Sequence, residues 1–413
     1  MTDAAVKNAV LAISTLFEHP LLNAYHPPPV GIVYTDKQRI GLNWYAKAVS
    51  SVFTRISIDD ELKQIETALL TCLLFTSVEV QQVNIGSTVA LLEKGLRLVA
   101  RYKEVQEGSP SKPAIWVLDL VIPALCRQTI VFGIFGYALS QEAFTILDAL
   151  VPTGPTTILS LDDVRNDLYA ILVRIFNWIQ RVTAARPGSE AVRLFLQRER
   201  DHMLDWLRSW AERTQSFMET IDNGQHHGAA EVYSVLCCYE RVAYLWLSRS
   251  LHGHMYNDAE EQHSYMSILS YSEEALKHGS SQSSPSGASV TPFMLELGVM
   301  PALVFVGWQC RDIGICRQAV KLMRRCPAQE NLLVTELQVD LIQRLIAVEE
   351  MRSAETLLHV HGQQEGELVQ VPIVDRSLGL PRPGPPILED EGWRYGTDLF
   401  ARNSSHRCAR HNK

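Results

Sequence analysis

The sequence predicts an all-α protein, an irregular stack of about a dozen helices in two closely packed subdomains. Apolar residues recur at intervals of three and four over most of the chain, which is typical of helices with one buried face. No stretch alternates polar and apolar residues convincingly enough for a sheet. The 413 residues, 46% hydrophobic and 20% charged, are enough to bury a sizeable core.

The N-terminal helix is expected to begin behind a cap at Thr2 or Asp3, because such side chains accept hydrogen bonds from free backbone N–H groups. Its buried face is expected to hold four apolar residues at helical spacing: Val6, Val10, Ile13 and Phe17. A proline run at 27–29 predicts a loop, and the next helix is expected to start at Thr35 or Asp36.

Long helices are expected in the middle of the chain, over 61–75 and 80–102. Asp162 and Asp163 are expected to cap another that runs to Ile179. Each of these helices carries its apolar residues along one side, so each is expected to pack against a neighbour.

The longest apolar stretch, 114–139, is interrupted by four residues that do not suit a membrane span: Asp119, Pro123, Arg127 and Gln128. It therefore falls short of the roughly 20 uninterrupted apolar residues that cross a bilayer. Two buried helices that meet near Pro123 are expected instead, because proline breaks the helical hydrogen-bond pattern.

Composition divides the chain into four parts. Residues 1–278 form an N-terminal helical part, and 279–290 are a Ser/Gly-rich linker too polar to build a core. Residues 291–350 are expected to add three more helical segments. The last part, 351–413, is expected to be a poorly ordered tail, since helical periodicity fades from Gly362 onward and prolines accumulate after it.

The formal net charge of −8 argues against a chain that binds DNA or an anionic membrane on its own, because an acidic surface repels phosphate. The first residues lack the basic and apolar regions of a signal peptide. With no membrane span expected either, the protein is predicted to be intracellular.

Eight cysteines are expected to be free and mostly buried in a reducing compartment: Cys72, Cys126, Cys237, Cys238, Cys310, Cys316, Cys326 and Cys408. Zinc sites usually begin with two cysteines two to four residues apart, a spacing that Cys310, Cys316 and Cys326 do not have. The adjacent Cys237 and Cys238 cannot both face one metal from a helix.

Three pairs of histidines are candidate metal ligands: His226 and His227, His252 and His254, and His359 and His361. None has further ligands at a suitable spacing, so they are interpreted as surface residues. Gly133 and Gly136 are interpreted as sites of close helix packing rather than of phosphate binding. No catalytic, cofactor-binding or metal-binding residue is predicted, and the chain is expected not to be an enzyme.

Charged clusters are few. The basic pairs Arg198 with Arg200 and Arg324 with Arg325 are interpreted as parts of solvated helix faces. The acidic cluster 389–391 lies beside Trp393 and Tyr395. Acidic-aromatic segments of this kind can fold into the groove of a partner, although an incidental tail is the simpler interpretation.

Two groups of residues carry a resemblance to a known family. In the first, an apolar helix within LTCLLFTSVEVQQVN (70–84) ends in Glu79 and is followed by Asn84. The next helix carries three more residues of the pattern: Leu92, Gly95 and Leu96. With Trp44-Tyr45-Ala46-Lys47-Ala48 upstream, this pattern resembles the regulatory region of fungal binuclear zinc-cluster transcription factors.

The second group resembles the motif that closes the same regulatory region: Gly298, Pro301, Cys310, Arg311, Asp312, Arg317, Ala319 and Leu322. Within it, Asp312 is expected to cap the helix that begins beside it, with Arg317 one turn further on. The sequence 348–350, Val-Glu-Glu, is similar to the acidic end of the last helix. The resemblance covers 4–350.

The resemblance implies a nuclear transcription regulator that acts through coregulator proteins, a small effector or a homodimer, and that controls a secondary-metabolite gene cluster. It implies no catalytic residue. The six-cysteine cluster with which family members bind zinc and DNA is missing from this sequence. DNA would then be reached only indirectly, or through a zinc cluster missing at the N-terminal end.

A second hypothesis is a cytoplasmic all-helical scaffold that binds partner proteins and has no role in transcription. A scaffold of this kind usually shows a repeat period and a concave face of exposed aromatic residues, neither of which is evident here. An enzyme is the third hypothesis, which would require paired carboxylates, a metal or a cofactor lysine in an identifiable arrangement.

Overall fold

The computed structural model describes residues 3–19, 34–53, 61–108, 113–134, 139–152, 154–184, 190–221, 228–249, 258–280 and 298–362. These ranges contain thirteen α-helices, one five-residue π-helical turn and one very short β-hairpin. The prediction of an all-α protein is therefore confirmed.

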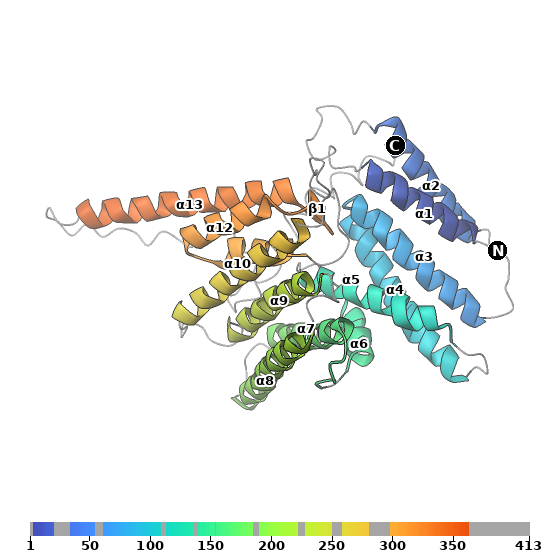
Figure 1. Cartoon of the computed structure of the whole chain (residues 1–413), viewed down its shortest axis with the longest axis horizontal. Coiled ribbons are helices and arrows are strands. Elements are labelled where there is room, and N and C mark those ends of the chain that lie inside the picture. The colour runs from blue at the N-terminus through green and yellow to red at the C-terminus, as the bar shows by residue number, and fades with distance from the viewer. Residues whose placement is uncertain are drawn as a thin grey trace.

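The first two helices, α1 (Ala4–Glu18) and α2 (Asp36–Phe53), lie side by side at one end of the molecule (Figure 1). Asp3 caps α1, since its Oδ1 accepts hydrogen bonds from the N–H groups of Ala5 and Val6 at 2.9 and 3.1 Å. Thr35 caps α2 through its hydroxyl, which accepts from the Gln38 N–H, while the Gln38 side chain accepts from the Thr35 N–H. These contacts agree with the predicted starts of both helices.

The buried face of α1 differs from the predicted one. Four small or medium residues are buried instead: Ala5, Ala9, Ala12 and Leu16. Val10 and Phe17, predicted to be buried, are 47% and 41% exposed. Since α1 packs against both α2 and α3 (Glu61–Gln81), alanines let the helix axes approach more closely than larger side chains would. The prediction of the buried side of α1, which relied on hydrophobicity alone, was therefore wrong.

The next helix, α4 (Ile85–Gly108), pairs with α3, and the break between them falls later than predicted, after Gln81 instead of before Val80. Val83 there has a positive φ of 53°. Asn84 starts α4, because its Oδ1 accepts from the Ser87 N–H at 3.4 Å. The local turn, rather than a change in hydrophobicity, sets this boundary.

Residues 115–134 of the apolar stretch do not form two buried helices that meet near Pro123. One helical path runs through the π turn Val117–Val121 into α5 (Ile122–Ile134). Pro123, which has no N–H to donate, directly follows the π turn, where the regular helical hydrogen-bond pattern is already interrupted. Ile115 and Leu120 are 74% and 65% exposed. Among the described residues, no helix combines the length and the apolar character needed to cross a membrane.

The middle helices are α6 (Gln141–Leu150), α7 (Leu161–Ala184), α8 (Glu190–Thr220), α9 (Ala229–Arg249) and α10 (Asp258–Ser280). The cap of α7 is Ser160 rather than the predicted aspartates. Its hydroxyl accepts from the Asp163 N–H at 3.1 Å and donates to the Asp163 carboxylate at 2.8 Å. The Asp163 carboxylate also accepts from the Leu159 N–H at 3.1 Å, so its side chain fixes the turn that leads into the helix.

Two tryptophans join α7 to α8. The Trp178 indole N–H donates to the Leu196 carbonyl at 3.0 Å, and the Trp210 indole N–H donates to the Val164 carbonyl at 2.9 Å. Both rings are fully buried. The hydrogen bonds satisfy the indole N–H groups, which would otherwise be costly to bury.

The C-terminal part contains α11 (Met300–Gln309), α12 (Ile313–Met323), β1 (Gln329–Glu330), β2 (Leu333–Val334) and α13 (Thr335–Gly362). Helix α13 continues twelve residues beyond the predicted boundary at 350 and projects past α12 in Figure 1. The predicted boundary coincides with the end of the resemblance, whereas the helix extends beyond it. Residues 363–413 lie outside the described residues.

The main hydrophobic core is continuous from Leu62 in α3 to Ile342 in α13. Helices on both sides of the predicted linker therefore pack into the same core. Of that linker, 279–280 are the last residues of α10, and 281–290 lie outside the described residues. Helices α1 and α2 add two smaller clusters against α3.

The hairpin β1–β2, which the sequence did not predict, connects distant parts of the chain. The Gln329 side chain donates to the Val80 carbonyl of α3 at 2.9 Å, and the Asn331 side chain donates to Gln128 of α5 at 2.8 Å. Asn331 itself has a φ of 52°, a conformation that asparagine tolerates well. The strands are only two residues long, too short to show alternation.

Gly307 of α11 packs directly against Ile342 of α13, and Gly307→Ala is expected to lower the free energy of unfolding by about 1–3 kcal/mol. A methyl group there would lie 2.7 Å from Cδ1 and 2.8 Å from Cγ2 of Ile342, which is fully buried. Urea denaturation followed by circular dichroism measures the loss. Gly86→Ala is the control, because no atom lies within 4 Å of that position. Equal stability of the parent and Gly307→Ala would contradict this close packing.

Candidate functional site

The cysteines are packing residues wherever the structure describes them. Six are buried and Cys126 is half-buried, while Cys408 lies outside the described residues. Burial raises the pKa of the Cys72 thiol to about 11 and those of Cys237 and Cys238 to about 12. These thiols therefore stay protonated at neutral pH, which is unfavourable for a nucleophile or a metal ligand.

The histidine pairs contribute no geometry to a site. Residues 226–227, 252 and 254 lie outside the described residues, as do the side chains of 359 and 361 on α13. Within the described ranges, no three His, Cys, Asp or Glu side chains are grouped so that they could hold a metal ion. Gly133 does permit close packing, since a Cβ there would lie 3.3 Å from the Phe176 ring, whereas Gly136 lies outside the described residues.

Three residues of the first resemblance group meet in space. The Tyr45 hydroxyl of α2 donates to Glu79 at 2.5 Å, and the Asn84 amide donates to the other Glu79 oxygen at 2.7 Å. Glu79 is buried in α3. Burial and the neighbouring Glu79 carboxylate raise the Tyr45 pKa, so the phenol remains a hydrogen-bond donor. This trio joins α2, α3 and the start of α4.

The second resemblance group organises the entry into α11 and α12. Val299 offers no side-chain cap to α11, and the buried Glu330 carboxylate takes that role by accepting from the Gly298 and Met300 N–H groups at 2.7 and 3.1 Å. Asp312 caps α12 as predicted, accepting from the Ile315 N–H at 3.0 Å. Burial raises the Glu330 pKa to about 8, more than the two backbone hydrogen bonds lower it.

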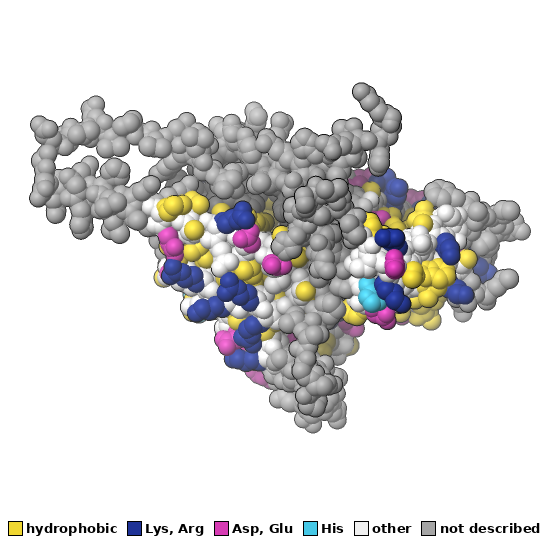
Figure 2. Space-filling model, turned by 90° about the horizontal axis from the view of Figure 1, so that it is seen from above, with side chains coloured by type: hydrophobic (Ala, Val, Ile, Leu, Met, Phe, Trp, Pro, Cys, Tyr) yellow, Lys and Arg dark blue, Asp and Glu magenta, His cyan; other side chains and the backbone are white. Residues whose placement is uncertain are grey.

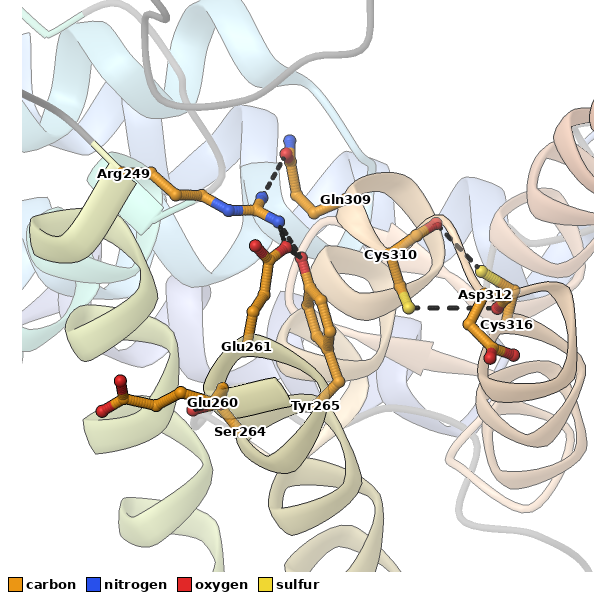
Figure 3. A network of polar contacts seen from close by, with 9 residues as sticks. All are labelled: Arg249, Glu260, Glu261, Ser264, Tyr265, Gln309, Cys310, Asp312 and Cys316. Carbon is orange, nitrogen blue, oxygen red and sulfur yellow. Dashed lines mark hydrogen bonds and ion pairs between the residues drawn. The ribbon is translucent and has the colours of Figure 1, made fainter. Parts of the chain in front are cut away.

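A polar network beside these helices is fully occupied by internal contacts (Figure 3). Arg249 of α9 donates to Gln309 of α11 at 2.8 Å and also contacts Tyr265 and Glu261 of α10. Its guanidinium lies 5.5 Å from the centre of the Tyr265 ring. Because this cation is already paired and hydrogen-bonded, the network holds three helices together rather than offering a binding site.

The Cys310 and Cys316 thiols lie at the edge of this network (Figure 3). The Cys316 thiol donates to the Cys310 carbonyl at 3.4 Å, and the Cys310 thiol contacts the Asp312 carbonyl at 3.9 Å. The contact with Cys316 and burial both raise the Cys310 pKa. These thiols stabilise the turn before α12, a structural role that agrees with the sequence interpretation.

A surface groove of about 270 Å³ lies between α12 and α13. Eight residues line it: Arg317, Val320, Lys321, Arg324, Gln343, Ile346, Ala347 and Glu350. Val320 is buried and, with Ile346 and Ala347, forms an apolar floor. We call this feature the α12–α13 groove. It is the candidate functional site.

One wall of the α12–α13 groove is cationic. Arg317 and Lys321 of α12 and its C-cap residue Arg324 follow one another at helical spacing, and all three are exposed. Arg317 pairs with Glu350 across the groove. Among the described residues, no carboxylate lies within ion-pairing distance of Lys321 or Arg324. The groove therefore carries two cationic side chains whose charge is not neutralised.

Figure 2 views the molecule from the side on which α13 lies in Figure 1, and its left half shows Lys and Arg side chains interspersed with hydrophobic ones.

The sequence alone predicts Arg324 and Arg325 to be a short cluster on a solvated helix face. The spacing of 317, 321 and 324 was the available signal. The apolar floor could not be inferred, because α13 supplies part of it from across the groove.

The α12–α13 groove has a lining suited to binding a ligand. Among the described residues that line it there is no Ser, Cys, His or Tyr, and the one carboxylate, Glu350, is already paired. Cations beside apolar surface favour a ligand that is anionic and partly apolar. Comparison of the chain with protein-family models, with curated proteins and with solved structures finds no match.

Proposed function

We propose that the chain is the non-catalytic body of a transcription regulator of the fungal zinc-cluster type, which acts through contacts with other proteins. The observation that carries the proposal is the contact of Tyr45, Glu79 and Asn84. Tyr45 belongs to one stretch of the resemblance and Glu79 and Asn84 to another, and direct contact between the two stretches is expected if the pattern specifies one fold. The Asp312 cap and the Arg317–Glu350 pair support the proposal in the same way.

In this proposal the protein works in the nucleus and reaches DNA through a partner or a zinc cluster outside this sequence. Coregulators, or a second copy of the chain, bind its helical surface. The α12–α13 groove is one contact site, because its cations and apolar floor suit protein ligands. No reaction is assigned to it.

A reporter assay tests this function. The chain is fused to a heterologous DNA-binding domain and placed upstream of a reporter gene, with the unfused domain as the control. We expect a change in reporter expression, and we expect a fluorescently tagged chain to enter the nucleus. An inert fusion together with exclusion of the tagged chain from the nucleus would contradict the proposal.

A cytoplasmic scaffold is the second candidate, favoured by four apolar residues exposed near the π turn: Ile115, Trp116, Leu118 and Leu120. Apolar residues exposed so close together commonly mark a protein contact. This function predicts a cytoplasmic location and co-purifying partners that are lost when Ile115 and Leu120 are replaced by Ser. The reporter assay would then give no signal.

A further inference from the structure

The α12–α13 groove has properties that restrict what can bind it. Arg317, Lys321 and Arg324 span about 10 Å of the α12 axis, at 1.5 Å per residue. Lys321 and Arg324 have no carboxylate partner among the described residues, and an apolar floor lies beside them. A suitable occupant carries several carboxylates close together, followed by a bulky apolar side chain that can cover the floor.

The chain itself contains such a segment. Glu389, Asp390 and Glu391 are consecutive, and Trp393 and Tyr395 follow within four residues. Side chains of an extended chain alternate in direction at about 3.3 Å per residue, so Glu389 and Glu391 would point to the same side roughly 7 Å apart, within the length of the cationic wall. We propose that the segment 389–395 binds in the α12–α13 groove of its own chain, with its carboxylates on Lys321 and Arg324 and its aromatic side chains over Val320 and Ile346.

Chain connectivity permits this contact. Helix α13, which lines the groove at Glu350, continues to Gly362, about 18 Å further along its axis. Glu389 lies 27 residues beyond Gly362, and a chain of that length can extend over as much as about 90 Å. A ligand tethered in this way has an effective concentration near the millimolar range, so modest complementarity is sufficient for occupancy.

This proposal does not depend on the proposed function, because it concerns only the α12–α13 groove and the segment 389–395 of the same chain. The segment would then occupy the groove, and a partner protein would have to displace the segment before binding there. Charge complementarity is its basis, and high salt should weaken it, since exposed charges are screened.

Limited chymotrypsin digestion of the full-length chain tests the contact. The bonds after Trp393 and Tyr395 fall inside the proposed segment, and the bond after Phe400 serves as an internal reference. We expect cleavage at the first two bonds to be at least about fivefold slower relative to Phe400 than in the variant Lys321→Glu/Arg324→Glu. Arg344→Glu is the matched control, because Arg344 is an exposed cation on α13 that does not line the groove.

Charge exchange and cross-linking separate this contact from other effects. Glu389→Lys/Glu391→Lys should remove the protection, and combining it with Lys321→Glu/Arg324→Glu should restore it. A zero-length carbodiimide reagent should join Lys321 to residues 389–391 within one molecule. Cross-links only between two molecules would overturn the proposal in favour of a second copy. Cleavage that is insensitive to the Lys321 and Arg324 changes, with no cross-link, would overturn it outright.

Discussion

Arg213→Ala is expected to lower the free energy of unfolding by about 3–5 kcal/mol. Arg213 of α8 donates to the Asp167 carboxylate of α7 and to the Thr156 carbonyl, both at 2.5 Å. The Asp167 side chain is fully buried, whereas Arg213 is 28% exposed. Removing the guanidinium leaves a buried charge with only the weak 3.4 Å contact from the Thr156 N–H. The loop before α7 also loses the hydrogen bond that Arg213 donates to the Thr156 carbonyl.

Urea denaturation measured by circular dichroism checks this result. Arg208→Ala is the control on the same helix, because Arg208 and its partner Asp205 are both 69% exposed, and it should leave the transition unchanged. The double replacement Arg213→Met/Asp167→Leu should recover most of the loss, since it removes both charges and keeps apolar volume. If Arg213→Ala behaved like Arg208→Ala, the buried pair would not stabilise the fold.

The free energy of unfolding is expected to fall as pH rises from about 5 to 8, and the ionisation of Glu330 is expected to be one cause. Its pKa is raised to about 8 in the folded protein, against a reference value of 4.5 for an exposed glutamate. The folded state therefore binds the proton more tightly than the unfolded chain. The stability that this group provides is complete below pH 4.5 and is lost as pH rises through 8, at up to about 1.4 kcal/mol per pH unit.

Glu330→Gln isolates this contribution, because glutamine cannot ionise and keeps an oxygen that can accept one of the two backbone hydrogen bonds. Thermal unfolding midpoints measured at pH 5, 6, 7, 8 and 9 should decline less steeply in the variant than in the parent. Glu240 contributes a slope of the same sign in both proteins, since burial raises its pKa to about 7. Glu273→Gln, at an exposed position on α10, is the control. Parallel pH profiles for the parent and Glu330→Gln would contradict the assignment.

The starts of several helices could be predicted because the signals are local. Asp3, Thr35 and Asp312 each accept a backbone hydrogen bond from a residue two or three positions further along the chain. Where a nearby competitor existed, the same reasoning failed. Ser160, and not Asp162, caps α7, because the hydroxyl and the Asp163 carboxylate satisfy each other.

The candidate site could be predicted only in part. The cations of α12 were visible in the sequence, but the apolar floor of the α12–α13 groove depends on Ile346 and Ala347 of α13. Likewise, Glu330 lies about thirty residues from the N–H groups that it caps. No local pattern identifies such a partner, because the energy gained depends on burial and on which helices become neighbours.

The sequence by itself determined the all-α class, the starts of several helices and the free, apolar setting of the cysteines, since periodicity and capping act within a few residues. The tertiary structure decided which face of α1 is buried, which carboxylate caps α11 and which cations keep no partner. These outcomes differ because backbone hydrogen bonding is settled within one or two turns. Packing is settled by close approach between distant segments, as at Gly307 and Ile342, where a single methyl group would not fit.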